Sequence, residues 1–380
     1  MITSKLPRAG TTIFTVMSRL ADDHGAINLS QGFPDFDGPQ ALRDRVGWHV
    51  ENGHNQYAPL AGLPALREAI ADKAASLYGR ETDPETEVVV TPGATEALYC
   101  AITAVVRPGD EVIVFDPAYD TYAPSVELNG GRTRHIALRH PDYRIDWEEV
   151  RAAITPETRM IVLNTPHNPS GTTWSEADIE GLRRAVDGTD ILLLSDEVYE
   201  HILFDGRQHV SLLRYPDLSR RAFCVFSFGK TYHATGWRVG YCIAPRELTD
   251  EFLKIHQYIN FSTNTPMQFA LADYLAATPE FHLGLGAFYQ EKRDEFCDLL
   301  SASRFGIEPA AGTYFQLADY SSISDEPDTD FARRLTIEHG VGAIPVSVFY
   351  RDPPGQKVVR FCFAKDGETL QAAARRLATL

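Results

Sequence analysis

The sequence has few cysteines, and none of them stands at a spacing that binds zinc or forms a redox pair. Its 380 residues include five cysteines, with no C-x-x-C and no Cys/His arrangement at zinc spacing. Sparse, unpaired cysteines in a long chain are typical of reduced thiols in a reducing compartment. We therefore expect no metal site.

Long apolar runs and an excess of basic charge are also missing. The apolar runs are short, as at residues 112–115 and 191–194, whereas a membrane helix needs ~20 apolar residues. The first residues show no apolar core of signal-peptide length. Lys and Arg total 36 against 52 Asp and Glu, a formal net charge of −16, which disfavours a nucleic-acid binder. We expect a soluble, cytoplasmic protein that binds neither membranes nor nucleic acid.

Several common nucleotide-binding and catalytic motifs are absent. No G-x-G-x-x-G follows a predicted strand, and no G-x-x-x-x-G-K-[ST] occurs, so the usual dinucleotide and P-loop signatures are excluded. The G-x-S-x-G elbow of serine hydrolases is missing as well.

What is present is a regular alternation of short apolar runs and amphipathic stretches. The runs predict strands, and the stretches between them predict helices, for example at residues 95–106, 146–154 and 175–187. This alternation indicates an α/β fold with a mostly parallel sheet. The sheet is expected to have seven strands, at residues 87–91, 111–115, 133–137, 160–164, 191–195, 222–226 and 239–244.

The pattern changes near residue 246. We expect a large domain over residues 46–275 and a smaller α+β domain formed by residues 1–45 and 276–380. The C-terminal part is predicted to hold helices at 247–258, 266–277, 281–303 and from 368 onward, with weaker strands at 313–317, 342–345 and 358–363.

Polar residues gather where the predicted strands end, and open α/β sheets bind ligands at these ends. A turn at Gly93, Ala94 and Thr95 opens a helix, whose free N–H groups suit an anion. An ordinary helix cap would have the same sequence. Ser227 and Arg238, which follow another predicted strand, favour the anion site over an ordinary helix cap. Together these residues predict a site for a phosphate monoester.

Lys230 follows a strongly apolar run close to that site. Burial there would disfavour the ammonium and leave a nucleophilic amine suited to Schiff-base formation, whereas a surface lysine would stay charged. Asp196 ends another predicted strand and needs a cation, such as a protonated pyridine nitrogen. Tyr199 and Asn168 suit a phenolate oxygen, although capping and turn roles would explain Asp196 and Asn168 separately. The set matches the polar atoms of pyridoxal 5'-phosphate.

These residues also carry a family resemblance. The motifs are NPSG at 168–171, SDEVYEH at 195–201, SFGKTYHATGWRVGY at 227–241 and VVRFCFA at 358–364. Over essentially its whole length the sequence resembles the fold-type I, pyridoxal-phosphate-dependent class I aminotransferases. INLSQGFPDFDGP at 27–39 and NQYAPLAG at 55–62 are similar to the kynurenine aminotransferase/glutamine transaminase K branch, and within it to the bacterial methionine aminotransferases.

The resemblance implies a role for each cofactor-binding residue. Lys230 would be the Schiff-base lysine and the catalytic acid/base, and Asp196 the partner of the ring nitrogen. Tyr199 and Asn168 would donate to the phenolate oxygen, and Tyr119 would stack on the ring. The implied phosphate ligands are Gly93, Ala94, Thr95, Ser227 and Arg238.

The resemblance also implies a substrate site. Arg360 would bind the substrate α-carboxylate together with Asn168, and Gly32 would let the N-terminal segment close over the substrate. Tyr57 would reach the phosphate bound by the neighbouring subunit, which implies a homodimer with shared active sites. Phe14, Tyr57 and Tyr119 are expected in an aromatic pocket wall.

The implied reaction is ping-pong transfer of the amino group from methionine and aromatic or other neutral amino acids to a 2-oxo acid. Dicarboxylate-specific relatives carry a second arginine, and no arginine occurs between Arg246 and Arg293. Aromatic walls favour neutral, soft or flat side chains. The alternatives are a kynurenine or glutamine transaminase and a cysteine-S-conjugate (cystathionine) β-lyase.

Overall fold

A seven-stranded mixed sheet forms the centre of the computed structural model, which describes residues 2–7 and 9–380. Its strands are β2 (Val88–Thr91), β3 (Glu111–Asp116), β4 (Arg132–Ala137), β5 (Thr158–Asn164), β6 (Leu192–Asp196), β7 (Ala222–Ser227) and β8 (Gly240–Ile243). Their order is β2-β8-β7-β6-β5-β3-β4. Strand β8 runs in the opposite direction to the other six strands. The predicted α/β fold with a mostly parallel sheet of seven strands is confirmed.

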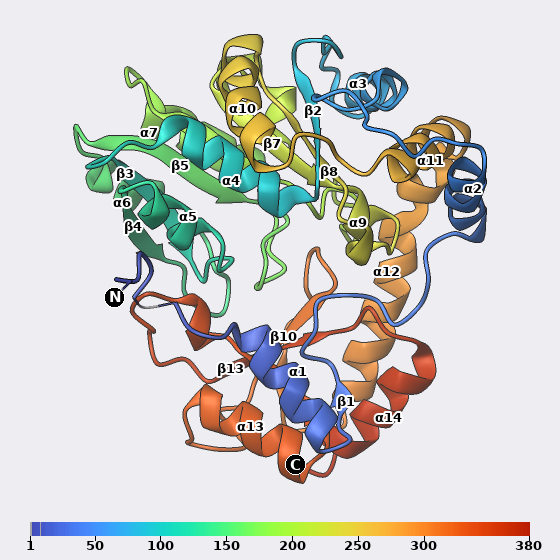
Figure 1. Ribbon diagram of the computed structural model, residues 1–380. Helices are drawn as coiled ribbons and strands as arrows, with labels where there is room; N and C mark the ends of the chain where they lie inside the picture. The colour runs from blue at the N-terminus through green and yellow to red at the C-terminus, as the bar shows by residue number, and fades with distance from the viewer. Residues whose placement is uncertain (1, 8) are drawn as a thin grey trace.

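Both faces of this sheet are buried. On β3, Val112 and Val114 belong to one hydrophobic cluster, whereas Ile113 and Phe115 belong to another on the opposite face. Strands buried on both faces are apolar almost throughout, as the inner strands here are, whereas the edge strand β4 is largely polar. Figure 1 shows α4 lying across the sheet. The first face is covered by α4 (Ala94–Val105), α5 (Tyr122–Leu128) and α10 (Arg246–Ile259), and the second by α2 (Gln40–Glu51), α3 (Pro64–Tyr78), α6 (Trp147–Ala153), α7 (Glu176–Val186), α8 (Pro216–Ser219) and α11 (Thr265–Ala277).

The two ends of the chain meet in a second group of elements. Helix α1 (Ile13–Asp23, blue) lies beside α13 (Asp328–Glu338, orange) below the large sheet in Figure 1. Strand β1 (Ile27–Asn28) pairs in parallel with β11 (Val341–Gly342). The group also contains α12 (Pro279–Leu300), α14 (Gly367–Leu377) and an antiparallel sheet of β12 (Ile344–Pro345), β13 (Val358–Cys362), β10 (Phe315–Asp319) and β9 (Gly306–Ile307), in that order.

This second group has a hydrophobic core of its own. Met17 and Leu29 from the N-terminal segment pack in one cluster with Phe296, Phe361 and Leu370 from the C-terminal part. The loops near residue 200 reach this core from the large sheet, because Tyr199 belongs to the same cluster. Residues that are far apart in the sequence therefore meet where the sheet ends.

Some predicted elements differ from the observed ones. The strand expected at 313–317 begins only at Phe315, because Thr313 has a φ of 64°, outside the range that strands use. The strand expected at 342–345 is split between two sheets, since β11 pairs with β1 and β12 pairs with β13. Helix α3 is not among the predicted elements, because its buried Arg67 and Lys73 blur the apolar periodicity.

Within residues 2–7 and 9–380, no helix combines the length and the apolar character that a membrane span requires.

Candidate active site

The strand register brings the predicted site residues to one edge of the large sheet. Asn164 at the end of β5 lies beside Asp196 at the end of β6. Strand β8 runs against its neighbours and therefore begins at this edge, where Gly240 pairs with Thr91 on one side and with Ser227 on the other. The loops that follow β2, β5, β6 and β7 therefore meet the segment that precedes β8.

The start of α4 forms a cradle for an anion. Gly93 precedes Ala94, the first helical residue, and makes no side-chain cap, so the first N–H groups keep free hydrogen-bonding capacity. A Cβ on Gly93 would come within 2.6 Å of Nη2 of Arg238, and the same Nη2 donates to Oγ1 of Thr95 over 3.4 Å. Ser227 ends its strand at the same edge. A helix N-terminus beside a guanidinium and hydroxyls suits a phosphate.

Asp196 is a buried carboxylate that has no ion-pair partner within the described part of the chain. The Tyr122 hydroxyl donates to its Oδ2 over 2.7 Å, and the Val198 N–H donates to Oδ1 over 3.4 Å. Burial raises the pKa of Asp196 to about 6, although both hydrogen bonds act in the opposite direction. Such a carboxylate is stabilised by a cation in contact with it.

Lys230 lies in the short helix α9 (Phe228–Thr231) and is half-buried. Its Nζ donates to the Tyr314 hydroxyl oxygen over 2.9 Å and to the Gly32 carbonyl over 3.2 Å. It also stands 5.6 Å from the centre of the Tyr199 ring. Burial lowers the pKa of Lys230 to about 8, so the neutral amine is far more populated near neutral pH than in an exposed lysine.

Arg360 on β13 is completely buried, with 0% of its surface exposed. Its Nη1 donates to Oδ1 of Asn168 over 2.8 Å and its Nη2 to the Ser30 carbonyl over 3.1 Å. Its Nε has no hydrogen-bond partner among the described residues. Burial lowers the pKa of Arg360 to about 10. A buried guanidinium that meets no carboxylate and keeps a free N–H is suited to bind an anionic ligand.

Aromatic rings surround this guanidinium. The carbon at the centre of the Arg360 guanidinium lies 3.9 Å from the ring centre of Phe315, 5.4 Å from that of Phe14 and 5.7 Å from that of Phe349. Phe14, which the resemblance places in an aromatic pocket wall, therefore lies beside Arg360. Tyr119 lies at the anion cradle instead, with its hydroxyl 3.4 Å from Oγ1 of Thr95.

Tyr57 is the one predicted site residue that the single chain does not bring to this edge. Its side chain is 81% exposed, and its ring meets the Phe261 ring edge-on at 5.4 Å. Residues 55–57 and 262–266 line a hollow of about 530 Å³ there.

Two tyrosines at the site are not among the predicted residues. Tyr122 supports Asp196, and Tyr314 accepts from Lys230. Tyr122 stands between Thr121 and Ala123, and Tyr314 between Thr313 and Phe315, contexts that do not distinguish a site tyrosine from a core tyrosine. A signal for them exists only in the three-dimensional contacts.

Comparison with known proteins shows which family this chain belongs to. The family described as "Aminotransferase class I and II" matches residues 24–377. The methionine aminotransferase of Escherichia coli is 56% identical over 377 residues, which cover 99% of this chain and 98% of that protein. The chain belongs to the class I and II aminotransferases.

Solved structures of other aminotransferases share the whole fold. The E. coli protein YbdL, described as having a methionine aminotransferase function, matches with a TM-score of 0.98 and 56% identity over 100% of both chains. The N-succinyldiaminopimelate aminotransferase of Mycobacterium tuberculosis matches with a TM-score of 0.96 and 35% identity, again over 100% of both chains. The kynurenine–oxoglutarate transaminase of Dictyostelium discoideum is 35% identical over 98% of this chain and 94% of its own.

The residues of this aminotransferase fit pyridoxal 5'-phosphate, the cofactor of its class. The cradle between Gly93 and Arg238 lacks room for even one Cβ, as expected where backbone N–H groups and a guanidinium approach a phosphate together. Asp196 is a buried carboxylate in need of a cation, which a protonated ring nitrogen supplies. The lowered pKa of Lys230 suits an amine that bonds to an aldehyde.

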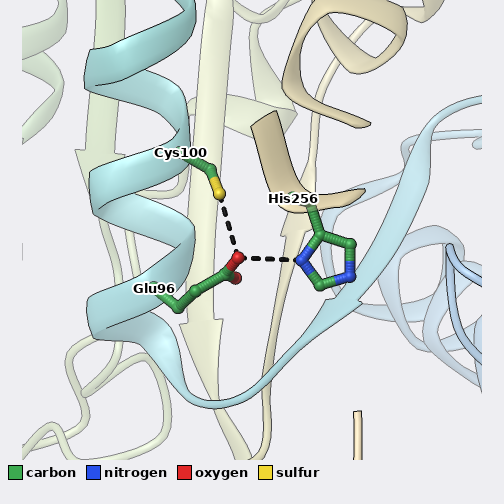
Figure 2. Close-up of side chains that lie close together, drawn as sticks. All are labelled: Glu96, Cys100 and His256. Atoms are coloured by element: carbon green, nitrogen blue, oxygen red, sulfur yellow. Dashed lines mark hydrogen bonds and ion pairs between the residues drawn. The ribbon is translucent and has the colours of Figure 1, made fainter. Parts of the chain in front are cut away.

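A compact cluster of Glu96, Cys100 and His256 lies behind the anion cradle, between α4 and α10 (Figure 2). The Cys100 thiol donates to Oε1 of Glu96 over 3.0 Å, and His256 Nδ1 lies 2.8 Å from the same oxygen. Burial, reinforced by Glu96, raises the pKa of Cys100, whereas a cysteine that binds a metal is a thiolate. His256 Nε2 meets the Leu60 carbonyl at 3.1 Å, so this nitrogen carries a hydrogen. Hydrogen bonds account for the cluster.

Proposed function

We propose that this aminotransferase takes methionine and aromatic or other neutral amino acids as donors and passes their amino group to a 2-oxo acid in a ping-pong reaction. The observation that carries the proposal is the buried guanidinium of Arg360 among the rings of Phe14, Phe315 and Phe349. The guanidinium suits an α-carboxylate, and the rings suit an apolar side chain. The methionine and kynurenine transaminases among the relatives support this assignment.

A distal carboxylate would need a second cation. The relatives that act on dicarboxylates use an arginine from the other subunit, and this chain has no arginine between Arg246 and Arg293. Burying a charged carboxylate without such a partner costs several kcal/mol, about 2–7 for an unpaired polar group and more for an ion. Aspartate should therefore be a poor donor.

The bound cofactor supplies an electron sink for the bond that breaks at the substrate Cα. The Asp196 carboxylate holds the proton on the ring nitrogen. Asn168 already uses its Oδ1 on Arg360, which leaves its amide N–H groups, with the Tyr199 hydroxyl, for the ring oxygen. With the cofactor bound, Lys230 would be released by the incoming amine and would carry the proton between the substrate Cα and the cofactor. The proposed phosphate ligands are Gly93, Ala94, Thr95, Ser227 and Arg238, with Tyr119 stacked on the ring.

We also propose two domains, residues 46–275 and residues 1–45 with 276–380. The separate hydrophobic cluster formed by both chain ends supports this division. Gly32 lies on the N-terminal segment, and its carbonyl accepts hydrogen bonds from Lys230 and Tyr314. Movement of the smaller domain would therefore carry this segment over the bound substrate. Hydrogen exchange with and without a substrate analogue would show whether residues 28–36 become protected together.

We also propose a homodimer with shared active sites, which the exposed position of Tyr57 supports. Tyr57, Tyr258 and Phe261 are exposed apolar residues, and such patches mark interaction sites. In a dimer of this kind each Tyr57 would reach the phosphate in the other subunit. The test is complementation between Lys230→Ala and Tyr57→Ala. Each variant alone should be impaired, while a mixed dimer contains one site with both native residues and should recover activity.

The direct test of function is a donor series with the purified enzyme and one 2-oxo acid. Methionine, phenylalanine and kynurenine should each yield their 2-oxo acids with kcat/KM at least about ten-fold above aspartate, a difference of about 1.4 kcal/mol. Pyruvate and ammonia from a cysteine S-conjugate, without methionine turnover, would favour the β-lyase alternative. Lys230→Ala should lose the visible absorbance of the purified enzyme and nearly all turnover. We expect the protein in the cytoplasm, where its substrates and reduced cysteines are stable.

A further inference from the structure

Tyr314 lies against the reactive end of Lys230, although it is not one of the residues that the family resemblance assigns. It belongs to the loop before β10, is fully buried, and packs edge-on against the Tyr199 ring, with ring centres 5.2 Å apart. Its hydroxyl donates to the Gly32 carbonyl over 2.6 Å. Because the hydroxyl proton is used there, the Tyr314 oxygen acts as an acceptor toward Lys230 Nζ, 2.9 Å away.

The Gly32 carbonyl is the second acceptor at this nitrogen. It lies 3.2 Å from Lys230 Nζ, so the Tyr314 oxygen and the Gly32 oxygen both face the amine. A neutral primary amine has two N–H bonds and one lone pair. Two acceptors that are themselves tied together by a hydrogen bond can hold both N–H bonds and leave the lone pair free.

We propose that Tyr314 is a positioning residue, which together with the Gly32 carbonyl holds the released Lys230 amine so that its lone pair points toward the substrate Cα. The inference rests on the proposed function, in which Lys230 carries the proton. In that step the Cα–H bond breaks, the proton joins the lone pair of Nζ, and the bonding electrons stay on the substrate side. The proton then leaves Nζ for C4′, and the amine returns to the same two acceptors.

This arrangement is specific to the hydroxyl, because the Tyr314 ring has packing neighbours of its own. The ring contacts Tyr199, Phe315 and Tyr289, and phenylalanine at this position would keep those contacts. Tyr289 provides a matched control. It is also fully buried, its ring centre lies 5.6 Å from that of Tyr314, and its hydroxyl lies 2.9 Å from His233 Nδ1 rather than at Lys230.

The experiment compares Tyr314→Phe, Tyr289→Phe and the wild-type enzyme in single-turnover reactions with methionine and with α-deuterated methionine. Tyr314→Phe should lower the maximal rate about ten-fold or more, as a misplaced catalytic group does, while the affinities for methionine and cofactor stay within about two-fold. The deuterium isotope effect should equal or exceed the wild-type value, because the slowed step is proton transfer. Tyr289→Phe should resemble the wild type.

Two results would overturn the inference. A wild-type rate in Tyr314→Phe would do so, and so would a slow rate whose isotope effect has fallen toward one. Lys230→Ala separates this failure from a failure of the proposed function, because an active Lys230→Ala enzyme contradicts the proposed function, whereas an inactive one together with a wild-type rate in Tyr314→Phe contradicts only the role of Tyr314.

A crystal structure provides a readout that does not depend on turnover or on the folding of a variant. In the cofactor-free wild-type protein, Lys230 Nζ should be ordered within hydrogen-bonding distance of both the Tyr314 and Gly32 oxygens. The same pair should hold Nζ when the cofactor is bound in its amine form. An Nζ that points away from Tyr314 in both structures would contradict the proposal.

Discussion

The Tyr122 hydroxyl donates a 2.7 Å hydrogen bond to Oδ2 of Asp196. The bond stabilises the ionised carboxylate and lowers the pKa of Asp196, whereas burial raises it. Burial has the larger effect, and the resulting pKa is about 6. Since only the carboxylate pairs with a protonated ring nitrogen, cofactor affinity should fall as the pH drops through this pKa. In Tyr122→Phe the pKa of Asp196 should rise further, which moves the midpoint of the affinity change from near 6 to about 7 or higher, because a hydrogen bond to a charged group contributes about 1.5–3 kcal/mol.

The measurement is a titration of the cofactor-free protein with pyridoxal phosphate from pH 5 to pH 8. The phosphate of the cofactor titrates in the same range, so the informative quantity is the difference between variant and wild type. Tyr320→Phe is the control, because Tyr320 is buried and donates to the Glu326 carbonyl in the C-terminal part. Equal midpoints in Tyr122→Phe and Tyr320→Phe would contradict the role of Tyr122.

Arg360→Lys should weaken use of every amino acid donor. Lysine keeps the charge but lacks the planar donor set of arginine. In Arg360 this set reaches Asn168 and Ser30 through the two Nη atoms and keeps the Nε hydrogen free for a ligand. Loss of one charge-assisted hydrogen bond, about 1.5–3 kcal/mol, corresponds to a fall in kcat/KM of about 10- to 150-fold. Steady-state kinetics with methionine measure the effect, and cofactor binding should stay normal.

Arg334→Lys is the matched substitution for this test. Arg334 is a partly exposed arginine that pairs with Glu326, and surface ion pairs of this kind contribute little, about 0–1 kcal/mol. Its kcat/KM should stay at the wild-type value. An Arg360→Lys enzyme with unchanged kcat/KM would remove Arg360 from the substrate site.

The edge of the sheet at which the site lies was predictable from sequence because its chemistry breaks the apolar pattern. Asp196 and Lys230 each follow a run of buried apolar residues, where a charged side chain needs a reason to be present. The inner strands of the large sheet were predictable for the same reason, since burial on both faces makes them largely apolar, whereas the edge strand β4 is polar and half-exposed.

The supporting contacts of the site were not predictable in this way. Tyr314 meets Gly32, and Arg360 meets Ser30, across hundreds of positions in the chain. Neither tyrosines in apolar surroundings nor backbone carbonyls have a sequence pattern that distinguishes such a role from core packing. Only the meeting of the two chain ends beside the large sheet brings these groups together.

Removal of metal ions should leave this enzyme intact. Glu96, Cys100 and His256 are held by hydrogen bonds, so dialysis against a chelator should change neither Tm nor turnover. His256→Ala should instead lower Tm by about 1–4 °C, since it leaves the nearly buried Glu96 carboxylate short of a partner at a cost of about 1–3 kcal/mol. His24→Ala, at the exposed end of α1, is the control. A chelator-sensitive Tm would contradict this account and indicate a bound metal.

Gly93→Ala should abolish tight cofactor binding. Two effects act at this position. The backbone φ of 86° is strained for a residue that has a Cβ, and this Cβ would lie 2.6 Å from Nη2 of Arg238. Gly109 isolates the first effect, because it has a φ of 98° and no atom within 4 Å of its Cβ position. Gly109→Ala should therefore cost about 1–3 kcal/mol of stability and leave the cofactor affinity unchanged.

Gly93→Ala should show a similar loss of stability together with at least about a hundred-fold weaker affinity for pyridoxal phosphate. The affinity falls because displacement of Arg238 removes a charge-assisted contact of about 1.5–3 kcal/mol and also distorts the helix start beside it. Absorbance titration of the two cofactor-free variants measures both affinities, and equal values would show that the contact between Gly93 and Arg238 is not part of the phosphate site.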